Sequence, residues 1–221
     1  GTETAVVVNQ NSNSVSYLNL GEAVEKVGEI SVGLSPQTVG YDAERQLIWV
    51  TNQGENSVSI LSSTSPRHLG VIKTKAAPYG VIISNKFAFV SNQHSNLIQV
   101  FDKYNYVLIA EIRVEDKPRG LTLTSDEKWL YATHFDSGKI SKIDAQRFGV
   151  IETISLGNRA GLTQSISIDQ NEKFAYIPNT IRNTDNTSLE FDTSVFPFVS
   201  IIDLESRKHL RSQRIALDII D

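Results

Sequence analysis

The chain repeats itself about every 42 residues, and this repeat restricts its possible folds more than any other feature. Each copy reads as an apolar strand, then Thr or Ser, then Asn, a short polar turn and a second strand. The anchor positions are spaced 43, 40, 42 and 45 residues apart and are Asn9, Asn52, Asn92, His134 and Asn179. The tetrapeptides around them include Trp-Val-Thr-Asn at 49–52 and Phe-Val-Ser-Asn at 89–92.

Two further landmarks keep the same step. A proline before the first strand of a period recurs 42 and 40 residues apart, at Pro36, Pro78 and Pro118. An isoleucine of the preceding strand recurs 42, 40 and 42 residues apart, at Ile30, Ile72, Ile112 and Ile154. At the fourth step the proline is lost, and the equivalent stretch is 157–161. Three landmarks in one period indicate a structural repeat.

Each period contains four short segments with the composition of β-strands. In residues 36–74 they are 37–42, 46–52, 57–61 and 68–74, rich in Val, Ile or Tyr and bounded by Gly, Pro, Asn, Asp or Ser. Four strands in such a period are typical of a β-propeller blade, which must cover its two apolar faces with neighbouring blades. We predict one all-β propeller domain, 1–221, of about five four-stranded blades, at approximately 1–32 (partial), 36–74, 78–114, 118–156 and 162–216.

The segments 49–61 and 89–102 resemble the YVTN-type β-propeller repeat, and this resemblance covers essentially the whole chain. It implies a ring that closes at seven blades, of which this chain would be a part, and a periplasmic or extracellular location. The first period lacks its innermost strand. Residues 217–221 could supply that strand in a five-bladed ring or begin a sixth blade. We expect open blade edges to pair with another chain.

Composition excludes several classes of function. The formal net charge is −4, and we find no run among the 21 Lys and Arg residues, so we predict no nucleic-acid partner. No apolar run approaches the roughly 18 residues of a membrane span. The chain has no Cys, which excludes disulfides and covalent haem, and its four His lack metal-ligand spacing. We therefore predict no cofactor and no metal.

Propeller geometry predicts that one face carries two sets of loops. These are the loops into each inner strand, at 33–36, 75–78, 115–119 and 157–162, and the turns after the anchors, at 9–14, 52–56, 92–96, 134–138 and 179–197. The anchor asparagines have a structural interpretation, because Asn can bond the backbone of its own turn. The prolines are interpreted as residues that stiffen the loops.

Deviations from the repeat on this face give the candidate binding residues. Arg119 follows Pro118, we place Arg159 in the equivalent loop one blade later, and Tyr79 follows Pro78. The arginines suit a small anionic ligand or a carboxylate of a protein partner, although a salt-bridged rim is the structural alternative. His134, with Phe135, replaces the Asn-Gln pair, and His94 follows the neighbouring anchor. A shared metal or proton transfer is possible there, but a structural role is favoured.

The fifth period contains a long interval, 180–197, where other turns need about four residues. Its apolar residues include Phe191 and Phe196, so we expect an ordered loop that packs on the same face or docks a partner. The stretch 191–197 also resembles propellers that precede a cytochrome c or di-haem peroxidase-like domain. The sequence thus favours an extracytoplasmic binding scaffold without a catalytic site of its own. The alternative is a lactonase-like hydrolase using Arg119, Arg159, His134 and Asp136.

Overall fold

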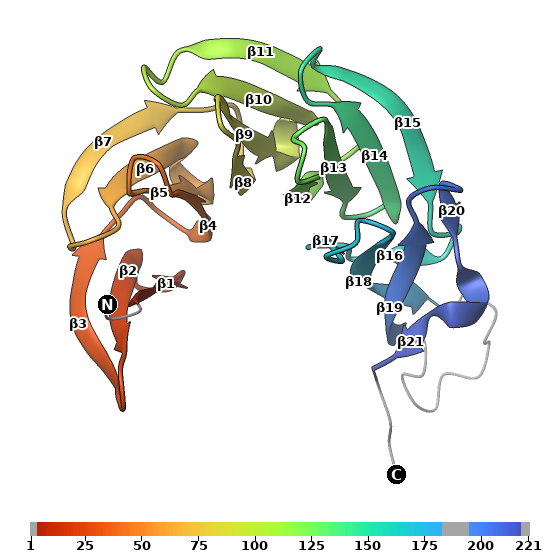
Figure 1. Cartoon of the computed structure of the whole chain (residues 1–221), viewed down its shortest axis with the longest axis horizontal. Helices are drawn as coiled ribbons and strands as arrows, with labels where there is room; N and C mark the ends of the chain where they lie inside the picture. The colour runs from red at the N-terminus through yellow and green to blue at the C-terminus, as the bar shows by residue number, and fades with distance from the viewer. Residues whose placement is uncertain (1–3, 183–194, 218–221) are drawn as a thin grey trace. The chain divides into compact units, whose positions relative to one another are not determined.

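A computed structural model describes residues 4–182 and 195–217 of the chain. The chain divides into two compact units, 1–111 and 112–221. In the described residues every sheet is antiparallel and the only helices are three-residue 3-10 turns (Figure 1). None of these helices has the length or the apolar character to cross a membrane.

The first unit contains three sheets built from consecutive strands. One has three strands in the order β1-β2-β3, and the others follow β4-β5-β6-β7 and β8-β9-β10-β11. The last strand, β11, ends two residues into the second unit. The strands are β1 Thr4–Asn9, β2 Ser14–Leu20, β3 Val24–Ser31, β4 Pro36–Asp42, β5 Leu47–Asn52, β6 Ser57–Ser62, β7 His68–Lys73, β8 Pro78–Ile83, β9 Phe87–Asn92, β10 Leu97–Asp102 and β11 Leu108–Arg113. Two 3-10 turns, η1 Gln53–Glu55 and η2 Gln93–Ser95, follow β5 and β9.

The second unit contains one four-stranded sheet, β12-β13-β14-β15, and a second sheet in the order β16-β18-β19-β20, with β17 beside β18 and β21 beside β19. In the second sheet β18 and β19 have nine residues each, and the other four strands have two each. The strands are β12 Pro118–Leu123, β13 Trp129–His134, β14 Lys139–Asp144, β15 Gly149–Ser155, β16 Ala160–Gly161, β17 Ser167–Ile168, β18 Phe174–Arg182, β19 Val195–Asp203, β20 Lys208–His209 and β21 Ile215–Ala216. A third 3-10 turn, η3 Arg211–Gln213, precedes β21.

The four-strand prediction for residues 36–74 is confirmed to within one residue at most ends. The absence of an inner strand from the first period is also confirmed for the described residues, because that sheet begins at β1. The long interval after Asn179 is shorter than we predicted. β18 and β19 continue their pairing to Arg182 and Val195, so Phe196 belongs to a strand opposite Ile181. Phe191 lies outside the described residues.

The core of each unit lies between neighbouring sheets. All six residues of β5 are buried: Ile48 and Val50 pack on the first sheet, whereas Trp49 packs on the third, near Val81 and Phe101. In the second unit, β14 and β15 pack on β18 and β19 in the same manner. A strand covered on both faces needs apolar residues at consecutive positions, which explains the continuous apolar runs before each anchor.

Carboxylates close the turn between β14 and β15 and the turn between β19 and β20. Asp144 Oδ1 accepts hydrogen bonds from the backbone N–H groups of Gln146 and Arg147, both at 2.9 Å. Asp203 does the same for Glu205 and Ser206, at 3.0 and 2.8 Å. These backbone donors hold the pKa of Asp144 and Asp203 below the ordinary value, because they bond the charged form.

Candidate functional site

The Thr-Asn pair of the repeat is part of the framework of the fold. Thr51 Oγ1 donates to the carbonyl of Tyr79 in the next sheet at 2.6 Å and accepts from Thr38 N at 3.1 Å. Asn52 Nδ2 donates to Ser57 Oγ and Ser59 Oγ at 3.0 and 2.9 Å, and its side chain is fully buried. Asn9 makes the same two bonds to serines of β2. The most regular residues of the sequence are therefore used for structure.

His134 replaces the anchor asparagine in the second unit and takes over its role. The residue is 0% exposed. Its Nε2 lies 2.8 Å from Ser141 Oγ, on the third strand, and its Nδ1 lies 3.0 Å from the carbonyl oxygen of Asp116. Burial lowers the pKa of His134, which favours the neutral ring. The structure thus places this candidate inside the sheet, where it has no surface to offer a ligand.

The substitution His134→Asn restores the anchor of the other sheets and should change the pH dependence of stability. We expect a loss of about 0.5–1.5 kcal/mol at pH 7.5, because one hydrogen bond disappears. The unfolded chain binds a proton at His134 near pH 6.5, whereas the folded chain does so only at lower pH, so the wild type loses stability as the pH falls below about 6.5. Urea unfolding at several pH values should show the wild-type advantage shrinking toward pH 5. A difference in unfolding free energy between wild type and variant that does not change with pH would contradict this prediction.

Entry loops and anchor turns lie at the same end of the sheets within each unit, as predicted. Gln53 N and Gly54 N donate to the carbonyls of Ser35 and Leu34. Phe135 N donates to the carbonyl of Lys117 in the second unit. Ser35 and Lys117 both have a positive φ, 51° and 45°, as has Ala77, which places the loop before each proline in one conformation. We call this end of the sheets the loop end.

At the loop end, side chains at equivalent positions differ between sheets. Gln37, which follows Pro36, donates to Gln53 at 2.9 Å. In the second unit the same two positions hold Arg119 and Phe135, and the guanidinium carbon of Arg119 lies 3.4 Å from the centre of the Phe135 ring. Both residues are half-buried. A neutral polar pair is replaced by a cation placed over an aromatic ring.

The other three candidates, Tyr79, His94 and Arg159, are divided between the two units. Tyr79 is half-buried at the start of β8, and His94 is exposed on η2; both belong to the first unit. Arg159 is exposed in the second unit, and its neighbour Ala160 pairs with Ile181, two residues beyond the anchor. Pro118, by contrast, pairs directly with the anchor His134. Arg159 is therefore not the structural equivalent of Arg119, because residues 157–161 place it beside the part of β18 that extends beyond the anchor Asn179.

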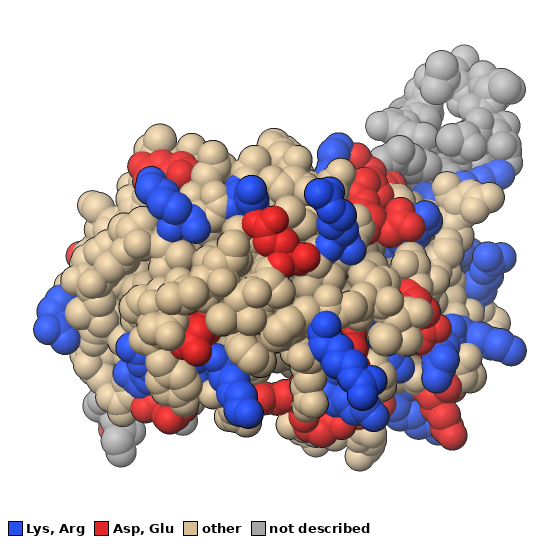
Figure 2. Space-filling model, turned by 90° about the horizontal axis from the view of Figure 1, so that it is seen from above, with Lys and Arg blue, Asp and Glu red and all other residues tan. Residues whose placement is uncertain are grey.

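No group of three or more potential metal-binding side chains occurs among residues 4–182 and 195–217. Of the groups named for the hydrolase alternative, His134 is buried and Asp136 forms an ion pair with Lys117. Charges of both signs are interspersed on the face shown in Figure 2.

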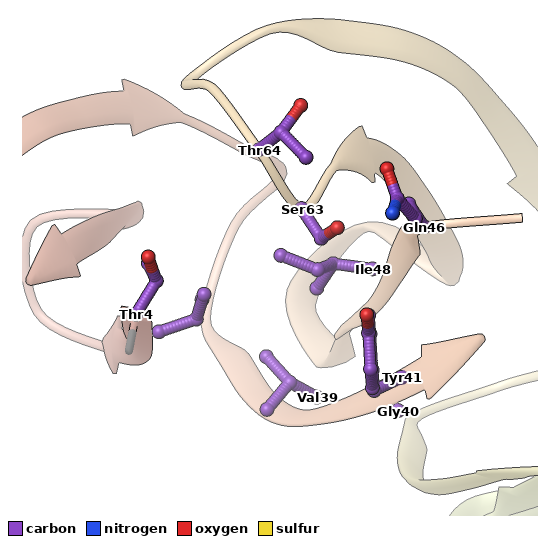
Figure 3. Close-up of a pocket in the computed structure, with 9 residues that line it drawn as sticks. Thr4, Val39, Gly40, Tyr41, Gln46, Ile48, Ser63 and Thr64 are labelled. Atoms are coloured by element: carbon purple, nitrogen blue, oxygen red, sulfur yellow. The ribbon is translucent and has the colours of Figure 1, made fainter. Parts of the chain in front are cut away.

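A pocket of about 630 Å³ with both polar and apolar lining residues lies beside β1 in the first unit (Figure 3). Its lining includes Thr4 of β1, Ile48 of β5, and Val39 and Tyr41 of β4. Val39 is 38% exposed, whereas Val81, which occupies the same register in the next sheet, is 8% exposed. An added Cβ on Gly40 of β4 would lie 3.3 Å from Val81, so β4 covers that residue. Among the described residues no inner strand pairs with β1, so Val39 lacks such cover.

This open edge supports the predicted association of chains. A lysine on an edge strand opposes pairing with a second strand. We expect Val7→Lys, on β1, to lower the self-association of the wild type in sedimentation velocity. Val107→Lys, in the turn between β10 and β11, is the control, because Val107 is 54% exposed and lies in no strand. A wild type that stays monomeric at every concentration would contradict the prediction.

Comparison with known proteins places the fold. No protein-family model and no curated protein matches the chain. Among solved structures, the hydrazine synthase of Kuenenia stuttgartiensis aligns over 99% of this chain with a TM-score of 0.89 and 21% identity. The Cps50 (Swd1) β-propeller domain of Myceliophteria thermophila aligns over 99% of this chain and 90% of its own, with a TM-score of 0.63 and 9% identity. The fold is a β-propeller.

A 6-phosphogluconolactonase candidate from Bacteroides uniformis aligns over 98% of this chain and 69% of its own, with a TM-score of 0.72 and 15% identity. The chain spans 64% of the length of the hydrazine synthase chain. At these identities the likeness concerns the fold alone. The assignment to YVTN-type repeats remains a prediction.

Proposed function

We propose that this β-propeller is an extracytoplasmic scaffold that presents its loop end to a protein partner. The observation that carries the proposal is the stack of Arg119 on Phe135, with 3.4 Å between the guanidinium carbon and the ring centre. Arginine and aromatic residues contribute strongly to binding energy at protein interfaces. A guanidinium ordered by a ring loses less side-chain freedom when it binds a carboxylate.

Arg119 and Phe135 are side-chain departures from the repeat at a place where the backbone keeps its usual bonding. Phe135 N bonds the entry loop in the same way as Gln53 N does in the first unit. Because this backbone bond is the same in both units, the fold of the blade does not require Arg119 and Phe135 in place of a neutral polar pair. Recognition of a partner is the simplest role for such a change at the ends of loops on a rigid scaffold.

A photo-crosslinking amino acid placed at Phe135 tests this proposal in cells of the source organism. We expect it to give a discrete adduct with a partner protein. The same amino acid at Phe148, a half-buried phenylalanine in the turn between β14 and β15 at the other end of the sheet, is the control and should give none. Arg119→Ala should lower the adduct yield at position 135 about tenfold, which corresponds to roughly 1.4 kcal/mol. Equal adducts at both positions would contradict the proposal.

The proposed location is tested by fractionation of the same cells, in which the protein should be released with the periplasmic or extracellular fraction. We also propose that the propeller accompanies a redox domain, on the resemblance of 191–197 noted above. Haem staining of the full-length gene product tests this part independently.

The alternative function is a lactonase-like hydrolase. It is compatible with the fold of the 6-phosphogluconolactonase candidate described above, and hydrolysis of a lactone panel would favour it.

A further inference from the structure

A basic cavity lies at the loop end of the second unit, apart from the stack of Arg119 on Phe135. Its volume is about 380 Å³. The walls come from the loop between β15 and β16, from β18, and from the segment that runs from β20 through η3 to β21. The lining residues with ionisable side chains are Arg159, His209, Arg211 and Arg214, and none of the lining residues is acidic.

The cationic groups come from two segments that are far apart in the sequence. Arg159 follows Gly157, whose φ of +113° is rare for other residues. A Cβ added at Gly157 would lie 3.8 Å from an Arg211 guanidinium nitrogen, so the glycine backbone and the arginine adjoin. Arg214 lies over the Phe198 ring, 4.6 Å from its centre. The Arg214 guanidinium is thus positioned by an aromatic ring, and the Arg211 guanidinium lies beside the Gly157 backbone.

Arg211, Arg214 and His209 have few partners within the described part of the chain. Residues 4–182 and 195–217 show no ion pair of Arg211 or Arg214, whereas the nearby Arg207 pairs with Glu152 at 3.4 Å. Both ring nitrogens of His209 are buried, and in those residues the ring has a weak contact with the Leu156 backbone but no hydrogen bond of good geometry. Burial and the charges of Arg211 and Arg214 lower the pKa of His209, an effect that the nearby Leu156 backbone partly offsets. Buried polar groups without partners are unfavourable unless a ligand or water bonds them.

We propose that this cavity binds a small oxyanion with two or more negative charges, held by Arg159, Arg211 and Arg214. Planar guanidinium groups bond carboxylate and phosphate oxygens in pairs, which a single lysine cannot do. The volume is at the lower end of the range of small-molecule pockets, so the ligand is a small molecule. This site uses other residues than the partner surface proposed above and extends the function to a second ligand.

Isothermal titration of the full chain with citrate and with inorganic phosphate, at constant ionic strength, tests the proposal. We expect saturable binding of at least one of the two anions. Arg211→Gln combined with Arg214→Gln should weaken it at least tenfold. The control is Arg147→Gln with Lys173→Gln, which removes the same charge from turns at the other end of the same unit and should change affinity less than twofold.

Two outcomes would overturn the proposal. One is binding that is absent, or that both double variants weaken equally, since the latter would reflect overall charge. The other is binding of an oligoglutamate peptide in the absence of citrate or phosphate binding, which would make the cavity a contact for an acidic protein segment. Circular dichroism of both double variants checks that they remain folded. The crosslinking experiment at Phe135 is unaffected by either outcome.

Discussion

The variant Lys103→Met is expected to lose about 3–5 kcal/mol of unfolding free energy in the first unit, because it leaves a buried carboxylate without its counter-charge. The Lys103 ammonium lies 3.2 Å from Asp42 and 2.8 Å from Glu44, and the side chains of Lys103 and Asp42 are 3% and 1% exposed. These bonds join the turn after β4 to the turn after β10. Arg45 adds a bond to the Lys103 carbonyl.

Urea unfolding followed by the fluorescence of Trp49 measures this loss, in a Trp129→Phe background that removes the tryptophan of the second unit. Lys86→Met, an exposed lysine in the same unit, is the control and should change stability by less than about 0.5 kcal/mol. The double variant Lys103→Met with Asp42→Leu should regain much of the loss, since neither charge remains. A loss below about 1 kcal/mol in the single variant would contradict the prediction, because it would show that the Asp42 carboxylate is still compensated without Lys103.

The same cluster gives a pH dependence whose sign follows from its bonds. Burial opposes the charge of Lys103, yet the hydrogen bonds to Glu44 and Asp42 leave its pKa above the ordinary value. A raised lysine pKa stabilises the fold below about pH 10.5 and ceases to do so as the pH rises through the folded value. Hydrogen bonds from Lys103 and Tyr104 lower the pKa of Glu44, so its contribution is lost in acid.

The repeat made the fold predictable because each period has to meet the same requirements. A strand covered on both faces must be apolar throughout, and in the first two sheets the anchor Asn donates to two serines of the next strand. The strands predicted in 36–74 therefore agree with β4 to β7. The fifth period was less predictable, because its inner edge is split into β16 and β17 and its hairpin extends past the anchor.

The candidate site was predictable only in part. Arg159 was found by its place in the period, but we judged the basic residues to form no run and overlooked the stretch 207–214, which holds Arg207, Lys208, His209, Arg211 and Arg214. That stretch is the signal that could have identified the other walls of the cavity. The loop that brings Arg159 to them is an insertion relative to the repeat, so the period contains no information about its path. His134 was noticed because it departs from the repeat, yet it performs the same structural task.

The substitution Gly120→Ala is expected to destabilise the second unit by about 1–3 kcal/mol, the usual range for overpacking. An added Cβ would lie 2.6 Å from the Ser165 Cα and 2.7 Å from the Gln164 carbonyl oxygen. Both are backbone atoms, so relief requires that the chain between β16 and β17 moves away from β12. The repeat alone does not predict this requirement, since Thr38 occupies the equivalent position in β4 and uses its hydroxyl to reach the Tyr79 carbonyl.

Gly149→Ala is the matched control in the same unit, because nothing lies within 4 Å of a Cβ added there. Replacing a strand glycine by alanine without a clash restricts the unfolded chain, so this control should be neutral or stabilise by up to about 1 kcal/mol. Unfolding is followed by Trp129 fluorescence in a Trp49→Phe background. If both variants had the same stability, the contact between β12 and the 164–165 backbone would be looser than the structure describes. A loss confined to Gly120→Ala would show that stability here depends on close approach of neighbouring blades at one residue without a side chain.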